Sequence, residues 1–353
     1  MVRLKKSKEE YDGELGFRRG RVILIIIVLT VLISIVWQGN YLATSPEPRT
    51  LVVYCFTGMQ EVMERGMFPA FQEYWEKEQG EHVEFIPTFA GSGTIVDKII
   101  SRFPAEVAIL SSPIDAIRLS ERVLVPAKSW ENLPNDGVFS RSPMIMIIRE
   151  GNPLGITDFS DLRNPGVEVI LPDPISSGAG QWVLLAVYGS AFRASGDALA
   201  AHRSVEEIWK NVFHDPSSSR EAIQLFTGGR GDVLITYEAN LQGNIERDQI
   251  PGQLIYPPGT IVSEHIVLPI NKHIQPGQRA LVDSFIQFLW GREAQQILTR
   301  YRFDRIDSSS AQSKEKFGDI SDAFTLDSLG GPRGVKRRII EKLIQALISP
   351  APY

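Results

Sequence analysis

The sequence predicts an α/β protein whose main body, from residue 50 onward, folds into two lobes with a ligand cleft between them. Apolar strand patterns alternate with helical patterns along this body, which is typical of βαβ units around a mainly parallel sheet. Two extended segments, residues 144–149 and 264–269, flank a central block that has its own alternation. Turns rich in small residues follow several strands, which is where ligands bind in open α/β sheets.

The first lobe opens with a regular series of elements. The spacing of apolar residues predicts strands over residues 51–56, 83–86 and 107–110, and helices over residues 60–79, 94–103 and 114–122. The single cysteine, Cys55, is expected to be a buried free thiol, because no second cysteine exists to pair with it. We predict that residues 50–142 and 265–353 form lobe 1 and that residues 143–264 form lobe 2.

The N-terminus carries an uncharged apolar run, residues 22–37, directly after Arg18, Arg19 and Arg21. By the positive-inside rule, residues 1–21 stay in the cytoplasm and the body lies outside it. We predict an uncleaved signal-anchor, a transmembrane helix over residues 22–42, followed by a linker over residues 43–49. Secretion after cleavage of this segment is the alternative, so in either case the protein is expected to be extracytoplasmic.

Charge limits the class of partner. Residues 1–49 hold eight of the 37 basic and five of the 42 acidic side chains, which leaves 29 basic and 37 acidic residues and a net charge of −8 on the body. Nucleic-acid binding requires a dense basic face, so we expect no nucleic-acid partner. An anionic ligand would have to be held by backbone N–H groups and helix dipoles, because the overall field repels it.

The most informative local pattern is the stretch 171–186, where a strand leads into a turn of hydroxyl and glycine residues and then into a helix. Such a turn brings the hydroxyls of Ser176 and Ser177 and the first helical N–H groups to one point, where the helix dipole favours negative charge. The turns at 90–93 and 217–219 have the same form, and residues 57–58 have a weaker version of it. Each alone could be an ordinary helix cap. Together they predict a binding site for an oxyanion.

Six motifs in chain order carry a resemblance to a known family. They are Ala-Phe-Gln-Glu-Tyr-Trp (70–75), Ala-Gly-Ser-Gly (90–93), Arg-Glu-Gly-Asn-Pro-Leu-Gly-Ile-Thr-Asp-Phe-Ser-Asp-Leu (149–162), Pro-Gly-Val-Glu-Val-Ile-Leu-Pro-Asp-Pro-Ile-Ser-Ser-Gly (165–178), Gly-Arg-Gly-Asp-Val-Leu-Ile-Thr-Tyr-Glu-Ala (229–239) and Phe-Thr-Leu-Asp-Ser-Leu-Gly-Gly (324–331). With them, residues 50–330 resemble the periplasmic sulfate- and thiosulfate-binding proteins of ABC importers. The resemblance implies the two-lobed type II periplasmic-binding-protein fold, a monomer without cofactors, and delivery of a captured small oxyanion to the ABC transporter permease subunits.

The resemblance also implies which residues bind a sulfate dianion without a counter-charge. Carried over residue by residue, they are Ser92, Gly93, Ser177, Gly178, Ala179, Ser219, Tyr237 and, with a weaker correspondence, Thr57. Tyr237 itself departs from the family, which has tryptophan there, and a phenol can accept as well as donate a hydrogen bond. As a structural alternative, Tyr237 is simply a core side chain.

Two further departures leave the identity of the oxyanion open. Asp173 stands where the family often has asparagine, and an inward carboxylate could accept the proton of a phosphate or phosphonate. Arg220 stands where the family has small residues, and a guanidinium there could pair with an oxyanion. The structural alternatives are a turn-forming aspartate and a solvated arginine. Molybdate and tungstate are further possible ligands.

Catalysis is the competing class of function. The five histidines fit no hydrolase signature and no Gly-x-Ser-x-Gly elbow occurs, so we expect neither catalytic residues nor a metal site, and a hydrolase on the same fold is the less favoured alternative. His265 is expected to be a structural histidine on the returning strand. The amphipathic segment 335–348 either packs on its lobe or contacts the membrane surface or the permease.

Overall fold

The computed structural model describes residues 24–35, 48–122, 124–126, 129–241, 251–303 and 320–348. The chain divides into two units, Met1–Arg49 and Thr50–Tyr353. In the first unit, residues 24–35 form a helix whose apolar side chains are exposed. Within the described ranges, no helix combines the length and the hydropathy that crossing a membrane would need. The remaining residues of the predicted span, 22–23 and 36–42, lie outside the described residues.

The second unit, the body, is built on a mixed sheet. Ten strands among the described residues follow the order β2-β1-β3-β9-β4-β7-β5-β6, with β10 beside β9 and β8 beside β4. The strands are β1 (Arg49–Phe56), β2 (Val83–Ala90), β3 (Val107–Leu110), β4 (Val138–Ile148), β5 (Val169–Ile170), β6 (Val212–His214), β7 (Val233–Tyr237), β8 (Gln253–Ile255), β9 (Gly259–Pro269) and β10 (Asp322–Phe324).

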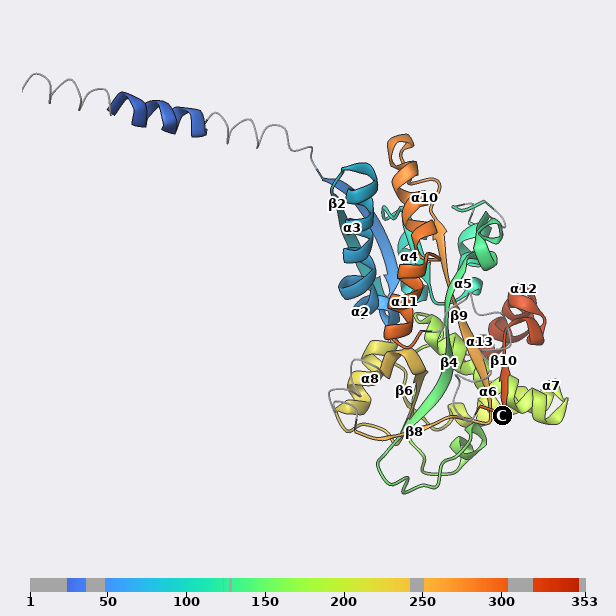
Figure 1. Ribbon diagram of the computed structural model, residues 1–353. Helices are drawn as coiled ribbons and strands as arrows, with labels where there is room; N and C mark the ends of the chain where they lie inside the picture. The colour runs from blue at the N-terminus through green and yellow to red at the C-terminus, as the bar shows by residue number, and fades with distance from the viewer. Residues whose placement is uncertain are drawn as a thin grey trace, which may run out of the picture. The chain divides into compact units, whose positions relative to one another are not determined.

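Two long strands, β4 and β9, connect the two parts of this sheet and run side by side through the body (Figure 1). The first half of β4 pairs with β9, and its second half, residues 144–148, pairs with β7. The other end of β9, residues 266–269, pairs with β3. The extended segments 144–149 and 264–269 are therefore parts of longer crossing strands. These pairings are antiparallel, whereas β1 with β3 and β5 with β7 and β6 are parallel, so the sheet is mixed and not mainly parallel.

Helices cover this sheet on both sides (Figure 1). They are η1 (Thr57–Met59), α2 (Gln60–Val62), η2 (Met63–Met67), α3 (Phe68–Gln79), α4 (Ser92–Ile100), α5 (Pro113–Glu121), η3 (Ser129–Asn132), η4 (Pro134–Gly137), η5 (Phe159–Arg163), α6 (Gly178–Ser195), α7 (Ala198–Trp209), α8 (Ser219–Thr227), η6 (Glu238–Leu241), η7 (Pro276–Gln278), α10 (Arg279–Phe288), α11 (Arg292–Arg300), η9 (Asp327–Leu329), α12 (Gly331–Val335), η10 (Lys336–Ile340) and α13 (Glu341–Ile348). The predicted helix 60–79 is confirmed as the continuous run from α2 to α3. It ends at Gly80, whose left-handed conformation is the usual stop signal of a helix.

The core contains the side chains that the apolar pattern predicts. Phe71 of α3 is fully buried and packs its ring edge-on against Phe285 of α10 at 5.1 Å between centroids. Cys55 in β1 is a buried free thiol, as expected.

The amphipathic segment 335–348 packs on the body. Val335, Ile339 and Leu343 are buried, and the segment lies against α6 and α7 on one side and, through α12, against α5 on the other. Lys336 donates hydrogen bonds to both carboxylate oxygens of Glu121 in α5, at 2.8 and 2.9 Å. Most of the apolar face is therefore used inside the protein, which favours the packing alternative.

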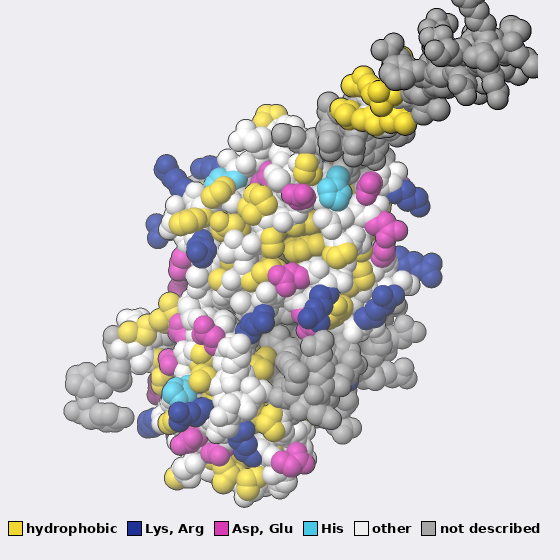
Figure 2. All heavy atoms as spheres, turned by 90° about the vertical axis from the view of Figure 1, so that its left-hand side faces the viewer, with side chains coloured by type: hydrophobic (Ala, Val, Ile, Leu, Met, Phe, Trp, Pro, Cys, Tyr) yellow, Lys and Arg dark blue, Asp and Glu magenta, His cyan; other side chains and the backbone are white. Residues whose placement is uncertain are grey.

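The surface carries charges of both signs. Figure 2 shows one face of the body on which Lys and Arg side chains alternate with Asp and Glu side chains, without a continuous basic area.

Candidate functional site

Three turns that precede helices meet in the body. A Cβ atom on Gly91, just before α4, would lie 2.4 Å from the carbonyl oxygen of Ser176 and 2.6 Å from that of Ser217. A Cβ atom on Gly93 would lie 2.3 Å from the carbonyl oxygen of Ile175. Only glycine permits backbones to approach so closely. The turns before α4, α6 and α8, which the sequence singles out, thus converge.

The N-terminus of α6 lies at the centre of this arrangement. Ser177 occupies the N-cap position, is 3% exposed, and its side chain makes no capping hydrogen bond. Gly178 and Ala179 begin the helix and are buried. The first N–H groups of a helix have no acceptor inside the helix and carry the positive end of its dipole. Ser177, Gly178 and Ala179 therefore present donors, and no formal charge, at one buried point.

The N-termini of α4 and α5 contribute a buried polar group next to this point. The hydroxyl of Ser92 donates to Oδ2 of Asp115 at 2.6 Å and accepts from the backbone N–H of Ser111 at 3.1 Å. Asp115 is fully buried, and this burial raises the pKa of its carboxyl group. A Cβ atom on Gly178 would lie 1.8 Å from Oγ of Ser111 and 3.1 Å from Oδ2 of Asp115, so both groups face the N-terminus of α6.

Sequence reasoning missed Ser111 and Asp115. Ser111 directly follows β3 and Asp115 lies in the first turn of α5, so both lie beyond the carboxyl end of a strand that is parallel to β1. The rule that places ligands beyond the carboxyl ends of strands would have found this segment.

Tyr237 ends β7 and is 1% exposed. Its ring stands edge-on to His265 at 5.3 Å and to Phe56 at 6.2 Å between centroids. Its hydroxyl makes no well-directed hydrogen bond to a described residue but interacts with the hydroxyl of Ser111, and burial raises the pKa of this phenol. Tyr237 therefore packs as a core side chain while its polar end is left uncommitted.

Asp173 does not point into the site. Its carboxylate accepts hydrogen bonds from the backbone N–H groups of Ile175 at 3.1 Å and Ser176 at 2.9 Å, and from the hydroxyl of Ser176 at 2.6 Å. The aspartate thus fixes its own turn, which is the structural alternative. The hypothesis of an inward Asp173 carboxylate that accepts a ligand proton is wrong.

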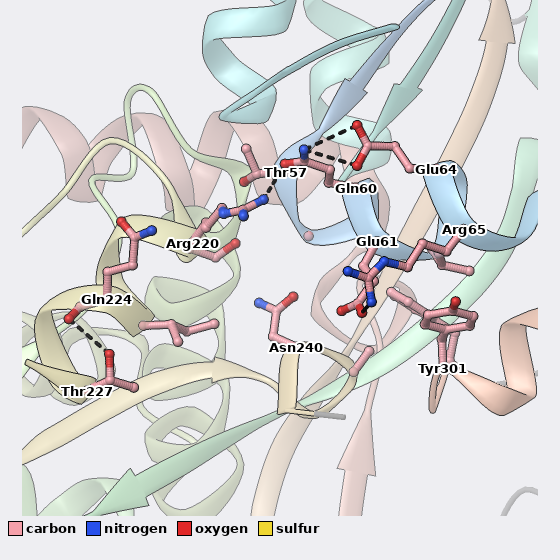
Figure 3. A pocket seen from close by; sticks show the side chains of 16 residues that line it. Thr57, Gln60, Glu61, Glu64, Arg65, Arg220, Gln224, Thr227, Asn240 and Tyr301 are labelled. Atoms are coloured by element: carbon pink, nitrogen blue, oxygen red, sulfur yellow. Dashed lines mark hydrogen bonds and ion pairs between the residues drawn. The ribbon is translucent and has the colours of Figure 1, made fainter. Parts of the chain in front are cut away.

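A cleft of about 450 Å³ lies beside the buried site and contains two of the predicted residues, Thr57 and Ser219. Arg220 lines it as well, so its side chain faces the cleft. Figure 3 shows the Arg220 guanidinium reaching from α8 to the side-chain oxygen of Gln60, to which it donates a hydrogen bond. This bond joins the two sides of the cleft. Next to the buried site, the N–H of Thr94 in α4 donates to the carbonyl oxygen of Ser176 in the turn before α6 at 3.1 Å.

His265 is a structural histidine. Its Nδ1 lies 2.9 Å from Oγ of Ser140 and its Nε2 lies 3.1 Å from Oγ of Ser263, all on the crossing strands β4 and β9. Complete burial lowers the pKa of the imidazole to about 3. In the described part of the chain, no group of three or more His, Cys, Asp or Glu side chains is arranged to hold a metal ion.

The predicted residues thus fall into two adjoining places. Ser92, Gly93, Ser177, Gly178, Ala179 and Tyr237 surround the buried N-terminus of α6, and Thr57 and Ser219 line the cleft. A two-lobed α/β body in which helix N-termini from both lobes converge is the architecture of a protein that binds a small ligand between its lobes.

The chain belongs to the family of bacterial extracellular solute-binding proteins, whose model matches residues 51–304. It is accordingly a binding protein and not an enzyme. It is 28% identical over 309 residues to the sulfate-binding protein of Synechococcus elongatus, which covers 86% of this chain and 87% of that protein. It is 30% identical over 271 residues to the thiosulfate-binding protein of Pseudomonas aeruginosa, with 71% of this chain and 81% of that protein covered.

A solved structure supports the same conclusion. The sulfate-binding protein SubI from Mycobacterium tuberculosis matches with a TM-score of 0.74 and 28% identity, over 82% of this chain and 99% of that one. A periplasmic thiamin binding protein, with a TM-score of 0.63 and 17% identity, shares the fold alone.

Proposed function

We propose that the protein captures a small tetrahedral oxyanion, sulfate or thiosulfate, outside the cytoplasm and delivers it to the permease subunits of an ABC importer. The observation that carries this proposal is the buried N-terminus of α6, where Ser177 makes no cap bond and Gly178 allows close approach. Local dipoles and neutral donors at such a place stabilise a dianion without a counter-charge. The sulfate- and thiosulfate-binding relatives support the choice of ligand.

The ligand-binding set in this proposal is the one that the resemblance implies, with Thr57 and Ser219 contributing from the cleft. The proposed lobes are residues 50–142 with 265–353, and residues 143–264, and they close about β4 and β9 as hinged binding proteins do. A contraction of the radius of gyration on adding sulfate, measured by small-angle scattering, tests this closure. The same measurement tests the proposed monomer.

A proton-bearing oxyanion such as phosphate is the second candidate, and Asp115 is the observation that favours it. Its buried carboxyl group lies beside the N-terminus of α6, and burial raises its pKa. A carboxylate there would accept a ligand proton but repel a fully ionised sulfate.

Calorimetric titration of the purified protein with sulfate, thiosulfate, phosphate and molybdate decides between these ligands. We expect tight binding of sulfate or thiosulfate. Preference for phosphate would transfer the proposal to the second candidate, and binding of none of these anions would reject the oxyanion function.

We also propose that residues 22–42 anchor the protein in the membrane, with residues 1–21 in the cytoplasm. The support is the apolar run behind three arginines, together with the family's extracytoplasmic location. Carbonate extraction of membranes from cells that produce the full chain tests it. Retention of the protein in the membrane pellet is expected, and release of a protein that begins near residue 46 would show cleavage instead.

A further inference from the structure

Ser111 has a buried hydroxyl group without a hydrogen-bond partner. The residue follows β3 and is 1% exposed, and its Oγ has no partner among the described residues. Buried polar groups are nearly always paired in folded proteins, so an unpaired one calls for an explanation. Five other buried serines of the body have paired hydroxyls: Ser92, Ser112, Ser140, Ser142 and Ser263.

The backbone holds this hydroxyl in a fixed place. The N–H of Ser111 donates to Oγ of Ser92 at 3.1 Å, and its carbonyl oxygen accepts from Nε1 of Trp182 in α6 at 2.6 Å. The hydroxyl lies against Gly178, since a Cβ atom there would stand 1.8 Å from Oγ. It is therefore aimed at the N-terminus of an eighteen-residue helix, where N–H groups and the dipole attract an anion.

Tyr237 supplies a second hydroxyl of the same kind from the other lobe. It is equally buried, and its oxygen makes no well-directed hydrogen bond to a described residue. Its polar neighbours are Asp115 and the hydroxyl of Ser111, with which it interacts as a weak hydrogen-bond partner. The two hydroxyls are thus neighbours whose mutual contact is poorly directed, and even when one donates to the other, the second proton stays uncommitted. Both can donate to a third group.

The hydroxyl of Ser92 cannot do the same in this arrangement. A serine hydroxyl has one proton, and that of Ser92 is directed to Asp115. On the side of lobe 1, Ser111 is the neighbouring hydroxyl whose proton is uncommitted.

We propose that Ser111 is an anion-binding residue, and that its hydroxyl and that of Tyr237 donate to the same bound oxyanion, one from each lobe. This inference rests on the proposed function. It accounts for two unpaired buried hydroxyls by giving them one ligand.

The test is calorimetric titration of the full-length protein with sodium sulfate, together with Ser111→Ala, Tyr237→Phe and the double variant. Each single variant is expected to bind sulfate at least tenfold more weakly, because a hydrogen bond to a charged ligand is lost. Residues that share one partner do not act independently, so the double variant's loss should differ more than twofold from the product of the single losses. If the loss of affinity in the double variant equals the product of the two single losses, the proposal that both hydroxyls donate to one anion is overturned.

Ser112→Ala is the matched control, because Ser112 is equally buried but its hydroxyl caps α5 by accepting from the N–H of Ile114. This variant should melt at a lower temperature and bind sulfate within twofold of the parent. Ser111→Ala should show the reverse. Without sulfate its melting temperature should equal or exceed that of the parent, and added sulfate should raise it less than it raises that of the parent.

The outcomes separate the two proposals. If the parent binds sulfate and Ser111→Ala binds it equally well, or if Ser111→Ala is destabilised without sulfate, the role of Ser111 is overturned and the oxyanion function stands. If the parent binds neither sulfate nor any other oxyanion of the panel, the function fails and this inference fails with it.

Discussion

The hydroxyl of Ser92 donates a hydrogen bond of 2.6 Å to Oδ2 of Asp115, a carboxyl group that is entirely buried beside the N-terminus of α6. This pair fixes the polar wall that the N-termini of α4 and α5 contribute to the site, because Ser92 also accepts from the N–H of Ser111. The donors for a ligand then come mainly from α6.

Ser177→Ala is predicted to weaken oxyanion binding by about ten- to a hundredfold, because one charge-assisted hydrogen bond is lost. Fold stability should change little, since the Ser177 side chain makes no capping bond. The matched control is Ser218→Ala, because Ser218 does cap its helix by accepting from the N–H of Glu221 at 3.3 Å. That variant should lose about 1 kcal/mol of unfolding free energy and keep its affinity within about threefold. Calorimetry and urea unfolding of both variants measure this contrast, and equal affinity of Ser177→Ala and the parent would contradict it.

Gly178→Ala is predicted to lower affinity more than tenfold. The added Cβ atom would lie 1.8 Å from Oγ of Ser111, so the lobes could not approach as they do here. Gly277→Ala is the control, since a Cβ atom at Gly277 would meet no atom within 4 Å. Titrations of the two variants with sulfate should differ accordingly. Parent-like binding by Gly178→Ala would mean that the close approach is dispensable.

Removal of the Gln60 side chain is predicted to speed ligand release. The bond from Arg220 to Gln60 joins the two sides of the cleft, and its loss should favour opening. At this exposed site we expect Gln60→Ala to raise the dissociation rate about three- to tenfold, with a smaller change in the association rate. Arg65→Ala is the control, because Arg65 lines the same cleft but pairs with Glu61 of its own helix. Stopped-flow release kinetics would show similar rates for all three proteins if the bond did not hold the cleft closed.

His265 is predicted to make stability depend on pH. Its pKa is about 3 in the folded protein and about 6.5 in an unfolded chain, so between these values the unfolded chain binds a proton that the folded protein excludes. The contribution of His265 is therefore complete above pH 6.5 and is lost as the pH falls towards 3, by at most about 1.4 kcal/mol per pH unit. Urea unfolding of the parent and of His265→Gln from pH 7 to pH 4 should give diverging curves. Parallel curves would mean that the imidazole titrates alike in both states.

The fold could be predicted from the sequence wherever a local pattern determines it. The helix 60–79 and the strand 107–110 are confirmed because their apolar spacing is regular. The strand expected over 83–86 continues to Ala90 because β2 is an edge strand, where Pro87 costs no ladder hydrogen bond. The antiparallel crossing of β4 and β9 depends on pairing between distant segments, which no local pattern encodes.

The candidate site, like the fold, could be predicted only where a local pattern marks it. The turns before α4, α6 and α8 are visible in the sequence because glycine and serine mark them. The segment after β3 could have been found from its place at the carboxyl end of a strand, but Asp115 itself could not be singled out in it. Ser112-Pro113 before Asp115 has the form of an ordinary helix start, and its partner Ser92 is 23 residues away. The sequence allows a carboxylate of Asp173 that faces the ligand, but the local hydrogen bonds of Asp173 to Ser176 rule this orientation out. Serine and aspartate side chains both cap turns and bind ligands, so the residue type alone does not show which of the two roles a position has.

The most direct test of the central claim is to locate the anion. Crystals of the protein grown with selenate, an isostere of sulfate, would be measured at the selenium absorption edge. We expect one strong anomalous peak at the N-terminus of α6. The selenate oxygens should lie within hydrogen-bond distance of the Ser177 hydroxyl and of the Gly178 and Ala179 N–H groups. A peak only beside Arg220 in the open cleft, or no peak in crystals that diffract well, would contradict it.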